Sequence, residues 1–387
     1  MENDMEKAAL MALNRIFGYA PRAGRALLER FGRASDIFSA GRDDLRGILG
    51  PVPKYLDRLV PKELEESCRE METLRSCGAD FIGIGEPSYP DRLADCSDPP
   101  LGLYCKSTSG KPDLNVPAFK IGIVGTRDMS SYGREWCTLI VRAFARAKPA
   151  PAIVSGLAFG IDCVAHMTAL DCGLPTIAVM ATGIDDVYPY RHIPLAERIT
   201  SAGQSALLTD YPCGTEPKPV NFLRRNRIIA GLSDAVVLVE SRAKGGGMIT
   251  ARLASEYNRD VYALPGRLDD IRSEGCNLLI REKIAETITD PDDLVRRIGL
   301  TAGKAYARKT LKELLSEYYE GLPEEDSALL EQVASLVRDN RGATIDELAA
   351  RSGIPARTVA QTAGMLETDG IISIDMLQRC SFNSKLL

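Results

Sequence analysis

The 387-residue sequence has few of the residues from which catalytic and metal sites are commonly built. It contains two histidines and one tryptophan, and aromatic residues make up 6% of the chain. Among its ten cysteines no pair stands at C-x-x-C spacing, so a structural zinc site is not expected. No Ser/His/Asp set is apparent either. The sequence therefore predicts no metal, no cofactor and no catalysis.

Long apolar segments are also missing. The N-terminus, MENDMEKAAL, is acidic and lacks the basic flank and apolar stretch of a signal peptide. No uninterrupted apolar run reaches membrane-spanning length. Several cysteines lie inside apolar runs, where free thiols act as small hydrophobic side chains. We expect a cytoplasmic protein without a membrane span.

Two common nucleotide-binding fingerprints are absent. No G-x-x-x-x-G-K-[ST] occurs, which argues against a P-loop ATPase, and IGIVGTRDMSSYG lacks the G-x-G-x-x-G of a dinucleotide site. The net charge is −5. Any nucleic-acid binding must therefore come from a local basic patch on a globally acidic protein.

Length and composition predict several folded domains. The chain is too long for one ordinary core, and 45% apolar with 26% charged residues is typical of a folded protein. Short helices separated by glycines are predicted for residues 1–80, and they resemble SAM or helix-hairpin-helix modules. Such hairpins can hold a DNA phosphate on backbone amides, although packing alone is their commoner role. The proline-rich residues 81–118 are predicted to be a linker and lead-in segment.

Residues 119–295 alternate short apolar strands with glycine turns and helices. FKIGIVG precedes SYGREWCTLIVRAFARA, and AIVSG precedes GIDCVAHMTALDCG. Near-continuous apolar strands of this kind are typical of a parallel sheet buried on both faces. The sequence predicts an α/β fold with an extended Rossmann-like, doubly wound and mainly parallel sheet. Its ligand crevice should lie at the carboxyl ends of the strands.

A charged linker is predicted at 296–322, followed by a third unit at 323–387. Three helical patterns and a two-strand-like tail in this unit match the plan of a winged helix. From Glu324 to Leu387, however, six basic residues stand against ten acidic ones, a net charge of −4. That charge is wrong for a unit that grips DNA by its phosphates, so we favour a protein-contact role.

Glycines concentrate where the strands of the central domain meet helices. A glycine there lets backbone amides approach a ligand, and the N-terminus of the next helix attracts anions. Turn geometry alone would explain any one loop, but several on one sheet edge favour a phosphate-binding face. These glycines are Gly125, Gly156, Gly160, Gly183 and Gly245 to Gly247.

The segment KPVNFLRRNRIIAGLS is basic and has no acid between Lys218 and Gly231. Arginine forks match phosphate oxygens, and the neighbouring Phe222 can stack on a base. Positive charge at the start of a helix also opposes the helix dipole unless an anion is bound. The alternative is a solvated helix face that pairs with distant carboxylates.

Seven blocks, in order, resemble the motifs of the DprA/Smf family (DNA processing protein A, recombination mediator). They are IVGTR, VSGLAFGIDCVAH, GIDDVYP, FLRRNRIIAGLSD, LVES followed by GGGMITA, ALPG and GCNLLI, spanning about residues 119–290. The resemblance implies a non-catalytic protein that binds single-stranded DNA without sequence preference. It also implies a homodimer formed through the Rossmann domain, and a role in loading a RecA-type recombinase during natural transformation or recombination.

By matching position, the resemblance implies phosphate contacts at Arg127 and in the block Arg224 to Arg227, with Ser155 and Gly156 on the pocket floor. The family commonly has an Asn and a Lys after its YP block, whereas this chain has Tyr190, Arg191 and His192. Arg191 is therefore a weaker candidate. The full predicted DNA-binding set is Gly125, Thr126, Arg127, Ser155, Gly156, Arg191, Phe222, Arg224, Arg225, Asn226, Arg227, Gly245, Gly246 and Gly247.

Two other functions remain open. GGGMITARLASE resembles the P-G-G-x-G-T-x-x-E loop of nucleoside-phosphate hydrolases, but it lacks the leading proline. Three closely spaced arginines also suit a polymer better than one phosphate. A transcriptional regulator using the winged helix is disfavoured by the acidity of that unit. Asp162 and His166, four apart on a predicted helix, are expected to form a hydrogen-bonded pair that orients the glycine loop.

Overall fold

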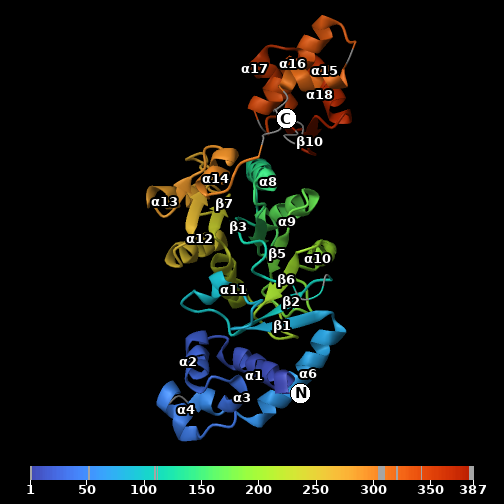
Figure 1. The fold of residues 1–387 in the computed structure, drawn as a ribbon. Helices are drawn as coiled ribbons and strands as arrows, with labels where there is room; N and C mark the ends of the chain where they lie inside the picture. Colours follow the sequence, from blue (N-terminus) through green and yellow to red (C-terminus); the bar gives the residue numbers. More distant parts are fainter. Residues whose placement is uncertain are drawn as a thin grey trace. The chain divides into compact units, whose positions relative to one another are not determined.

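The computed structural model describes residues 2–50, 53–108, 110, 112–303, 310–319, 321–340 and 342–382. The chain divides into two compact units, Met1–Gly303 and Lys304–Leu387 (Figure 1). Within the described ranges, no helix combines the length and the apolar character needed to cross a membrane.

The first unit begins with six helices that share an apolar core including Leu13, Phe17 and Leu27. Gly24 is required where this core meets the rest of the unit, because a Cβ at that position would lie 2.4 Å from Leu101 and 3.1 Å from Phe17. The helices are α1 (Glu2–Phe17), α2 (Pro21–Phe31), α3 (Ala34–Ile37), α4 (Arg42–Leu49), α5 (Pro53–Leu56) and α6 (Pro61–Ser76).

A nine-stranded sheet follows, in the order β1-β2-β6-β5-β4-β3-β7-β8-β9. Strands β3 to β9 pair in parallel, while β2 pairs antiparallel with both β1 and β6. The predicted α/β fold with a large, mainly parallel sheet is confirmed. The strands are β1 (Ala79–Gly83), β2 (Gly102–Lys106), β3 (Lys120–Val124), β4 (Ala152–Ser155), β5 (Thr176–Val179), β6 (Ala206–Thr209), β7 (Ala235–Leu238), β8 (Asp260–Ala263) and β9 (Glu286–Thr287).

Helices cover both faces of this sheet (Figure 1). On one face pack α11 (Pro219–Leu232), α12 (Gly246–Glu256) and α13 (Glu274–Arg281), and on the other α8 (Ser131–Arg146), α9 (Ile161–Asp171) and α14 (Pro291–Arg297). Strand β3 contributes Ile121 and Ile123 to one core and Val124 to the other, because successive strand residues point to opposite faces.

The prediction that residues 81–118 form a linker is wrong. They complete β1 and supply α7 (Asp91–Ala94) and β2, and Phe81 and Leu103 within them are fully buried. Each of these strands has five residues and stands near prolines, so its alternation is too short to recognise. The predicted linker 296–322 is also shorter than expected, since α15 (Leu311–Tyr318) packs into the core of the second unit. Residues 304–309 lie outside the described residues.

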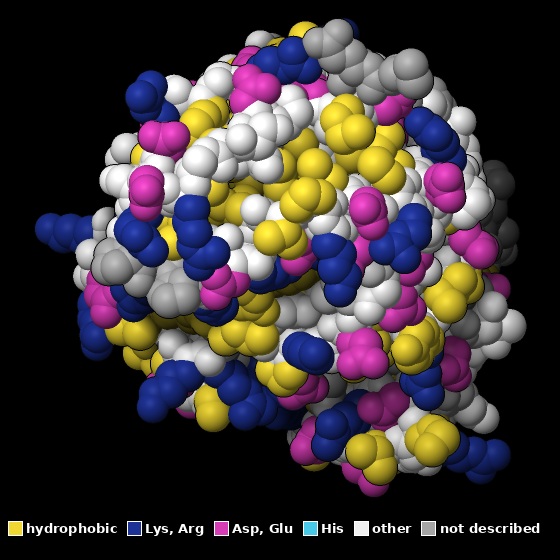
Figure 2. All heavy atoms as spheres, turned by 90° about the horizontal axis from the view of Figure 1, so that it is seen from below, with side chains coloured by type: hydrophobic (Ala, Val, Ile, Leu, Met, Phe, Trp, Pro, Cys, Tyr) yellow, Lys and Arg dark blue, Asp and Glu magenta, His cyan; other side chains and the backbone are white. Residues whose placement is uncertain are grey.

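The N-terminal helices and the sheet form one unit rather than separate domains. Met11 and Leu74 pack in one core with Phe81, Tyr104 and Leu207 of the sheet. The helices gather beyond the edge formed by β1 and β2 (Figure 1). Their outer face carries an area of hydrophobic side chains with Lys and Arg side chains around it and Asp and Glu among them (Figure 2).

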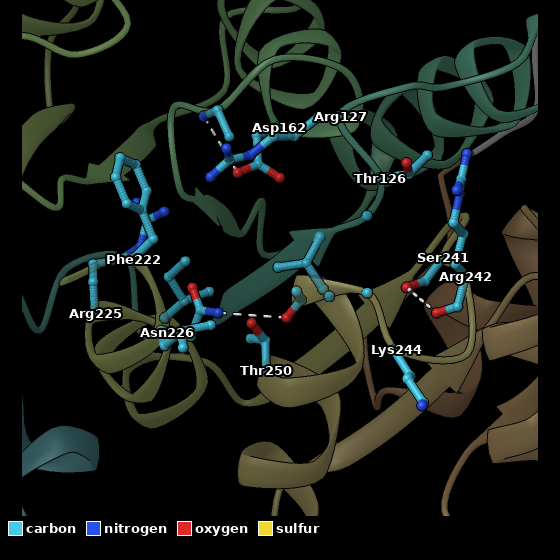
Figure 3. Close-up of a pocket in the computed structure, with 18 residues that line it drawn as sticks. Thr126, Arg127, Asp162, Phe222, Arg225, Asn226, Ser241, Arg242, Lys244 and Thr250 are labelled. Carbon is cyan, nitrogen blue, oxygen red and sulfur yellow. Dashed lines mark hydrogen bonds between the residues drawn. The ribbon is translucent and has the colours of Figure 1, made fainter. Parts of the chain in front are cut away.

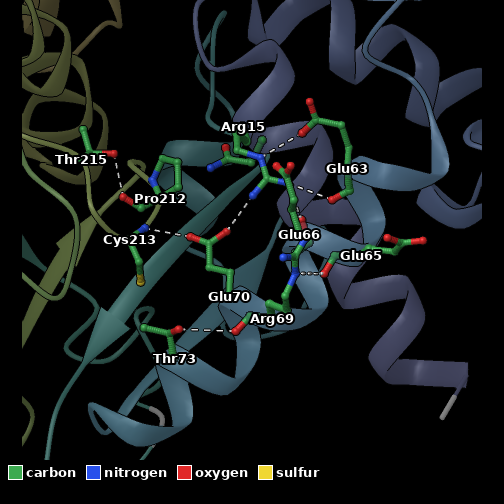
Figure 4. Close-up of polar contacts among 12 residues, drawn as sticks. Arg15, Glu63, Glu65, Glu66, Arg69, Glu70, Thr73, Pro212, Cys213 and Thr215 are labelled. Atoms are coloured by element: carbon green, nitrogen blue, oxygen red, sulfur yellow. Dashed lines mark hydrogen bonds and ion pairs between the residues drawn. The ribbon is translucent and has the colours of Figure 1, made fainter.

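A polar network strengthens this contact (Figure 4). Arg15 of α1 donates to Glu63 (3.0 Å) and Glu70 (3.1 Å) of α6. Glu70 in turn accepts a hydrogen bond of 2.8 Å from the backbone amide of Cys213, in the segment after β6. Burial raises the pKa of Glu70, while the Cys213 amide and Arg15 oppose that rise.

The second unit has its own core, which includes Leu330, Val337, Leu348 and Leu366. Its helices after α15 are α16 (Glu324–Asp339), α17 (Ile345–Ser352) and α18 (Ala356–Thr368), followed by the antiparallel strands β10 (Ile372–Ile374) and β11 (Cys380–Phe382). A capping box between Thr344 and Glu347 begins α17. The assignment of this unit as a winged helix stays a prediction.

Candidate nucleic-acid interface

A pocket of about 390 Å³ opens at the carboxyl edge of the sheet (Figure 3). Chain order runs from β3 outward through β4, β5 and β6, and then returns to β7 on the other side of β3. The pocket therefore lies at the topological switch point, where ligands bind in open α/β sheets. Its walls come from the β3–α8 loop, the start of α9, helix α11, and the loop and first turn that lead into α12.

Glycines bring two of these walls together. A Cβ on Gly125 would lie 2.6 Å from Ile161, and one on Gly247 would lie 2.7 Å from Leu238 and 3.4 Å from the Cα of Gly125. Close packing thus accounts for these two glycines. Gly246 differs, because nothing surrounds its Cβ position within 4 Å and the residue is exposed at the start of α12. Free amides at such a helix start attract anions.

Three exposed cations line the pocket: Arg127, Arg242 and Lys244. Arg242 lies 3.9 Å from the carboxylate of Asp128. Arg127 and Lys244 have no carboxylate partner among the described residues. Arg127 instead lies over the ring of Phe222, 5.0 Å from its centroid, in a cation–π contact. The pocket therefore presents uncompensated positive charge beside an aromatic ring.

The floor of the pocket contains a buried pair, Arg225 and Asp162. Asp162 accepts hydrogen bonds from the amides of Gly156 (3.1 Å) and Ala158 (3.4 Å), so it orients the glycine loop, residues 156–160. Arg225 donates to the carbonyls of Gly156 and Val179. Burial raises the pKa of Asp162 and lowers the pKa of Arg225 to about 10, and each charge opposes the shift of the other. Arg225 is therefore still a cation at neutral pH.

The expected pair between Asp162 and His166 does not form. His166 lies within hydrogen-bond distance of Thr176, with 2.7 Å between Nδ1 and Oγ1. Thr176 Oγ1 donates to the carbonyl of Ile153, so it accepts from Nδ1, and the buried Nε2 has no partner in the part of the chain that the structure describes. Burial lowers the pKa of His166 to about 3. His166 therefore takes no part in orienting the glycine loop, which is bonded by Asp162, Arg225 and His192.

Arg224 and Arg227 do not line the pocket. Arg227 forms a buried ion pair of 2.7 Å with Asp210 and donates to the carbonyl of Asp98. Arg224 donates to the carbonyl of Gly18, and its guanidinium lies 3.7 Å from the ring centroid of Tyr19. Neighbouring helix residues point in different directions, so one basic run cannot face a single ligand. For Arg227, pairing with a distant carboxylate is what the structure shows.

Most other predicted residues do meet at the pocket. Asn226 points from α11 toward the first turn of α12, with 3.4 Å between its Nδ2 and the carbonyl of Gly246 (Figure 3). Ser155 and Gly156 do not line the pocket. Ser155 donates to the carbonyl of Ile123, and the guanidinium of Arg225 covers Gly156. The predicted residues that line it are Gly125, Thr126, Arg127, Phe222, Arg225, Asn226, Gly245, Gly246 and Gly247.

Sequence reasoning missed Arg242 and Lys244, which stand in RAK directly before the glycine run. A signal was present, because basic residues that lead into a glycine-rich helix start favour an anion. Among the described residues, no cluster of three His, Cys, Asp or Glu side chains is placed to hold a metal ion.

A doubly wound sheet with a basic, amide-bearing pocket at its switch point defines a Rossmann-like protein built to bind an anionic ligand. Comparison with known proteins specifies this class further. The family model described as DNA recombination-mediator protein A matches residues 80–299, more than half of the chain. The chain belongs to the DprA/Smf family.

Relatives of known name support this assignment. The chain is 34% identical over 295 residues to protein Smf of Synechocystis sp., covering 76% of this chain and 73% of that protein. It is 36% identical over 230 residues to DNA processing protein DprA of Bacillus subtilis, covering 59% and 75%.

Two solved structures are similar as well. The X-ray structure of DNA processing protein A from Streptococcus pneumoniae has a TM-score of 0.62 and 30% identity, covering 76% of this chain and 96% of that chain. A structure of the Helicobacter pylori protein, described in terms of its single-stranded DNA binding mode, has a TM-score of 0.50 and 29% identity, covering 57% and 95%.

Proposed function

We propose that this protein binds single-stranded DNA without sequence preference through the pocket at the carboxyl edge of its sheet. In this proposal it is a non-catalytic recombination mediator that helps to load a RecA-type recombinase. Phosphates contact Arg127, Lys244 and the amides at the start of α12. Arg225 supplies charge from the floor, whereas Arg224 and Arg227 hold α11 in place.

One observation carries the proposal, namely the unpaired cations Arg127 and Lys244 beside free amides and the half-buried ring of Phe222. A phosphodiester supplies the negative charge that Arg127 and Lys244 lack, and Phe222 offers a face to a base. The Helicobacter pylori relative, whose single-stranded DNA binding mode has been described, supports this choice of ligand.

Binding of oligo-dT, followed by fluorescence anisotropy, tests the proposal. Arg127→Ala should weaken binding to every sequence by a similar factor. Arg296→Ala is the matched control, because Arg296 is an exposed arginine on α14 whose carboxylate partner, Asp293, is 3.4 Å away. Equal affinities for the wild-type protein and both variants would contradict the proposal.

The position of Glu256 does not support the nucleotide-hydrolase alternative. Glu256, the acid of GGGMITARLASE, is exposed at the far end of α12, whereas the pocket meets the first turn of that helix. An 11-residue helix separates its ends by about 15 Å. Release of phosphate from nucleoside monophosphates would nevertheless establish the enzyme.

We also propose a homodimer formed through the sheet unit and a protein-contact role for the second unit as a winged helix. Light scattering should give twice the chain mass of 42.1 kDa at micromolar concentration. A strand-exchange assay with a RecA-type recombinase tests the loading role, since the protein should shorten the lag on coated single strands.

A further inference from the structure

Two tyrosines extend the aromatic surface of the pocket beyond Phe222. The ring of Tyr188 lies 5.8 Å from that of Phe222, at an interplanar angle of 66°. Tyr190 follows, 5.9 Å from Tyr188 and at 77°. Tyr188 is 37% exposed and Tyr190 is 62% exposed, so both keep solvent-facing ring surface. We refer to Phe222, Tyr188 and Tyr190 as the aromatic track.

A buried hydrogen bond holds the segment that bears the tyrosines against the glycine loop. Tyr190 begins the short helix η1 (Tyr190–His192), and His192 is buried and donates from Nδ1 to the carbonyl of Leu157, 2.8 Å away. Leu157 has a φ of +57° and lies in the glycine loop that Asp162 orients. A non-glycine residue in this conformation needs such support from its surroundings. His192 therefore ties the track to the pocket loop.

Charge around the track also suits a polyanion. Arg127 covers Phe222 at one end, and Arg191 is exposed beside Tyr190 at the other, without a carboxylate partner among the described residues. Asp185, an exposed acid in the same segment, accepts a bifurcated hydrogen bond from the amide of Gly214 on both carboxylate oxygens. Cations thus bracket the rings.

We propose that the aromatic track stacks successive bases of a single strand as it leaves the pocket, with Arg191 contacting the backbone at the far end. This inference rests on the proposed function and names Tyr188 and Tyr190 as further contacts of the same ligand. The rings are inclined to one another, so each offers a separate face. Stacking on aromatic rings tolerates every base, in agreement with binding without sequence preference.

The test compares Tyr190→Leu, which removes the ring, with the control Tyr190→Phe, which keeps it. Two oligo-dT lengths are used, about 4 nucleotides to fill the pocket and about 16 to reach the track. Tyr190→Leu should weaken binding of the longer strand about five-fold or more, at unchanged salt slope, and leave the shorter strand unaffected. Tyr190→Phe should bind both lengths as the wild type does.

A strand with abasic sites separates stacking from backbone contact. On such a strand, the wild type should bind no better than Tyr190→Leu binds the intact one. If Tyr190→Leu and Tyr190→Phe bind the longer strand equally, the stacking proposal is wrong, while the proposed function of the pocket is unaffected. If Arg127→Ala has no effect on the shorter strand, the proposed function itself fails.

Discussion

Arginines occur in two very different environments in this protein, the rim of the pocket and helix α11. At the rim, Arg127 is exposed and has no carboxylate partner among the described residues. On α11, Arg225 and Arg227 are only 3% and 7% exposed, and each is bonded to groups inside the protein. The basic run from Arg224 to Arg227 is thus mostly buried, whereas the exposed cations that line the pocket lie in loops.

A run of basic residues in the sequence therefore need not form a basic surface in the fold. A guanidinium that is buried must have its donors satisfied, and carbonyls and carboxylates then take the role that a ligand would otherwise fill. Arg227 neutralises Asp210 in this way, and Arg225 binds two carbonyls below the pocket. Such residues determine where α11 lies, whereas the rim cations remain free for a ligand.

The largest expected effect is on stability, from Arg227→Ala. Removing one partner of a buried pair leaves Asp210 charged and unpaired, so the free energy of unfolding should fall by about 3–5 kcal/mol. Urea denaturation measures this change. Arg127→Ala should stay within about 0.5 kcal/mol of the wild type. Equal stability losses for the two variants would remove the distinction between the two environments.

The buried His166 should make the free energy of unfolding depend on pH. Burial lowers the pKa of His166 from 6.5 to about 3, so between these values the unfolded chain holds a proton that the folded chain does not. The free energy of unfolding should therefore fall as the pH falls below 6.5, by up to about 1.4 kcal/mol per pH unit. His166→Leu should flatten the curve between about pH 5 and 6.5. An unchanged slope in this variant would show that His166 is protonated when folded.

Lys244 and Arg224 should contribute differently to DNA binding. Lys244→Ala should reduce the slope of log affinity against log salt by ~0.7 for single strands, because one phosphate contact is lost. Arg224→Ala should leave that slope unchanged, since Arg224 bonds to Gly18 and covers Tyr19. Anisotropy titrations over a range of salt concentrations distinguish the two. A reduced slope for Arg224→Ala alone would place the strand across α11 instead.

The smallest effect should follow from removing the second unit. It is a separate compact body with a net charge of −4 from Glu324 to Leu387, and of its basic residues only Arg357 lies on α18. A chain truncated after Gly303 should bind oligo-dT with nearly unchanged affinity. Saturable binding of duplex DNA by the isolated second unit at ~150 mM salt would instead support a regulator.

The alternation of strands and helices in the central region and the glycine loops at one sheet edge could be predicted from the sequence. These features depend on local periodicity and on turn residues, which neighbouring positions reveal. The sequence also determined that IVGTR and GGGMITA would meet, because carboxyl ends of parallel strands share one edge. The family followed from the order of such blocks.

Which cations line the pocket depends on the tertiary structure. Whether Arg227 meets solvent or Asp210 depends on how α11 packs against α7 and the strands of the sheet, and α7 and α11 are far apart in the chain. The same holds for β1 and β2, whose five-residue patterns become strands only when Phe81 is buried with Tyr104 in one core and Leu103 with Ile82 in another. Burial and pairing across the fold are long-range properties, and no local pattern contains them.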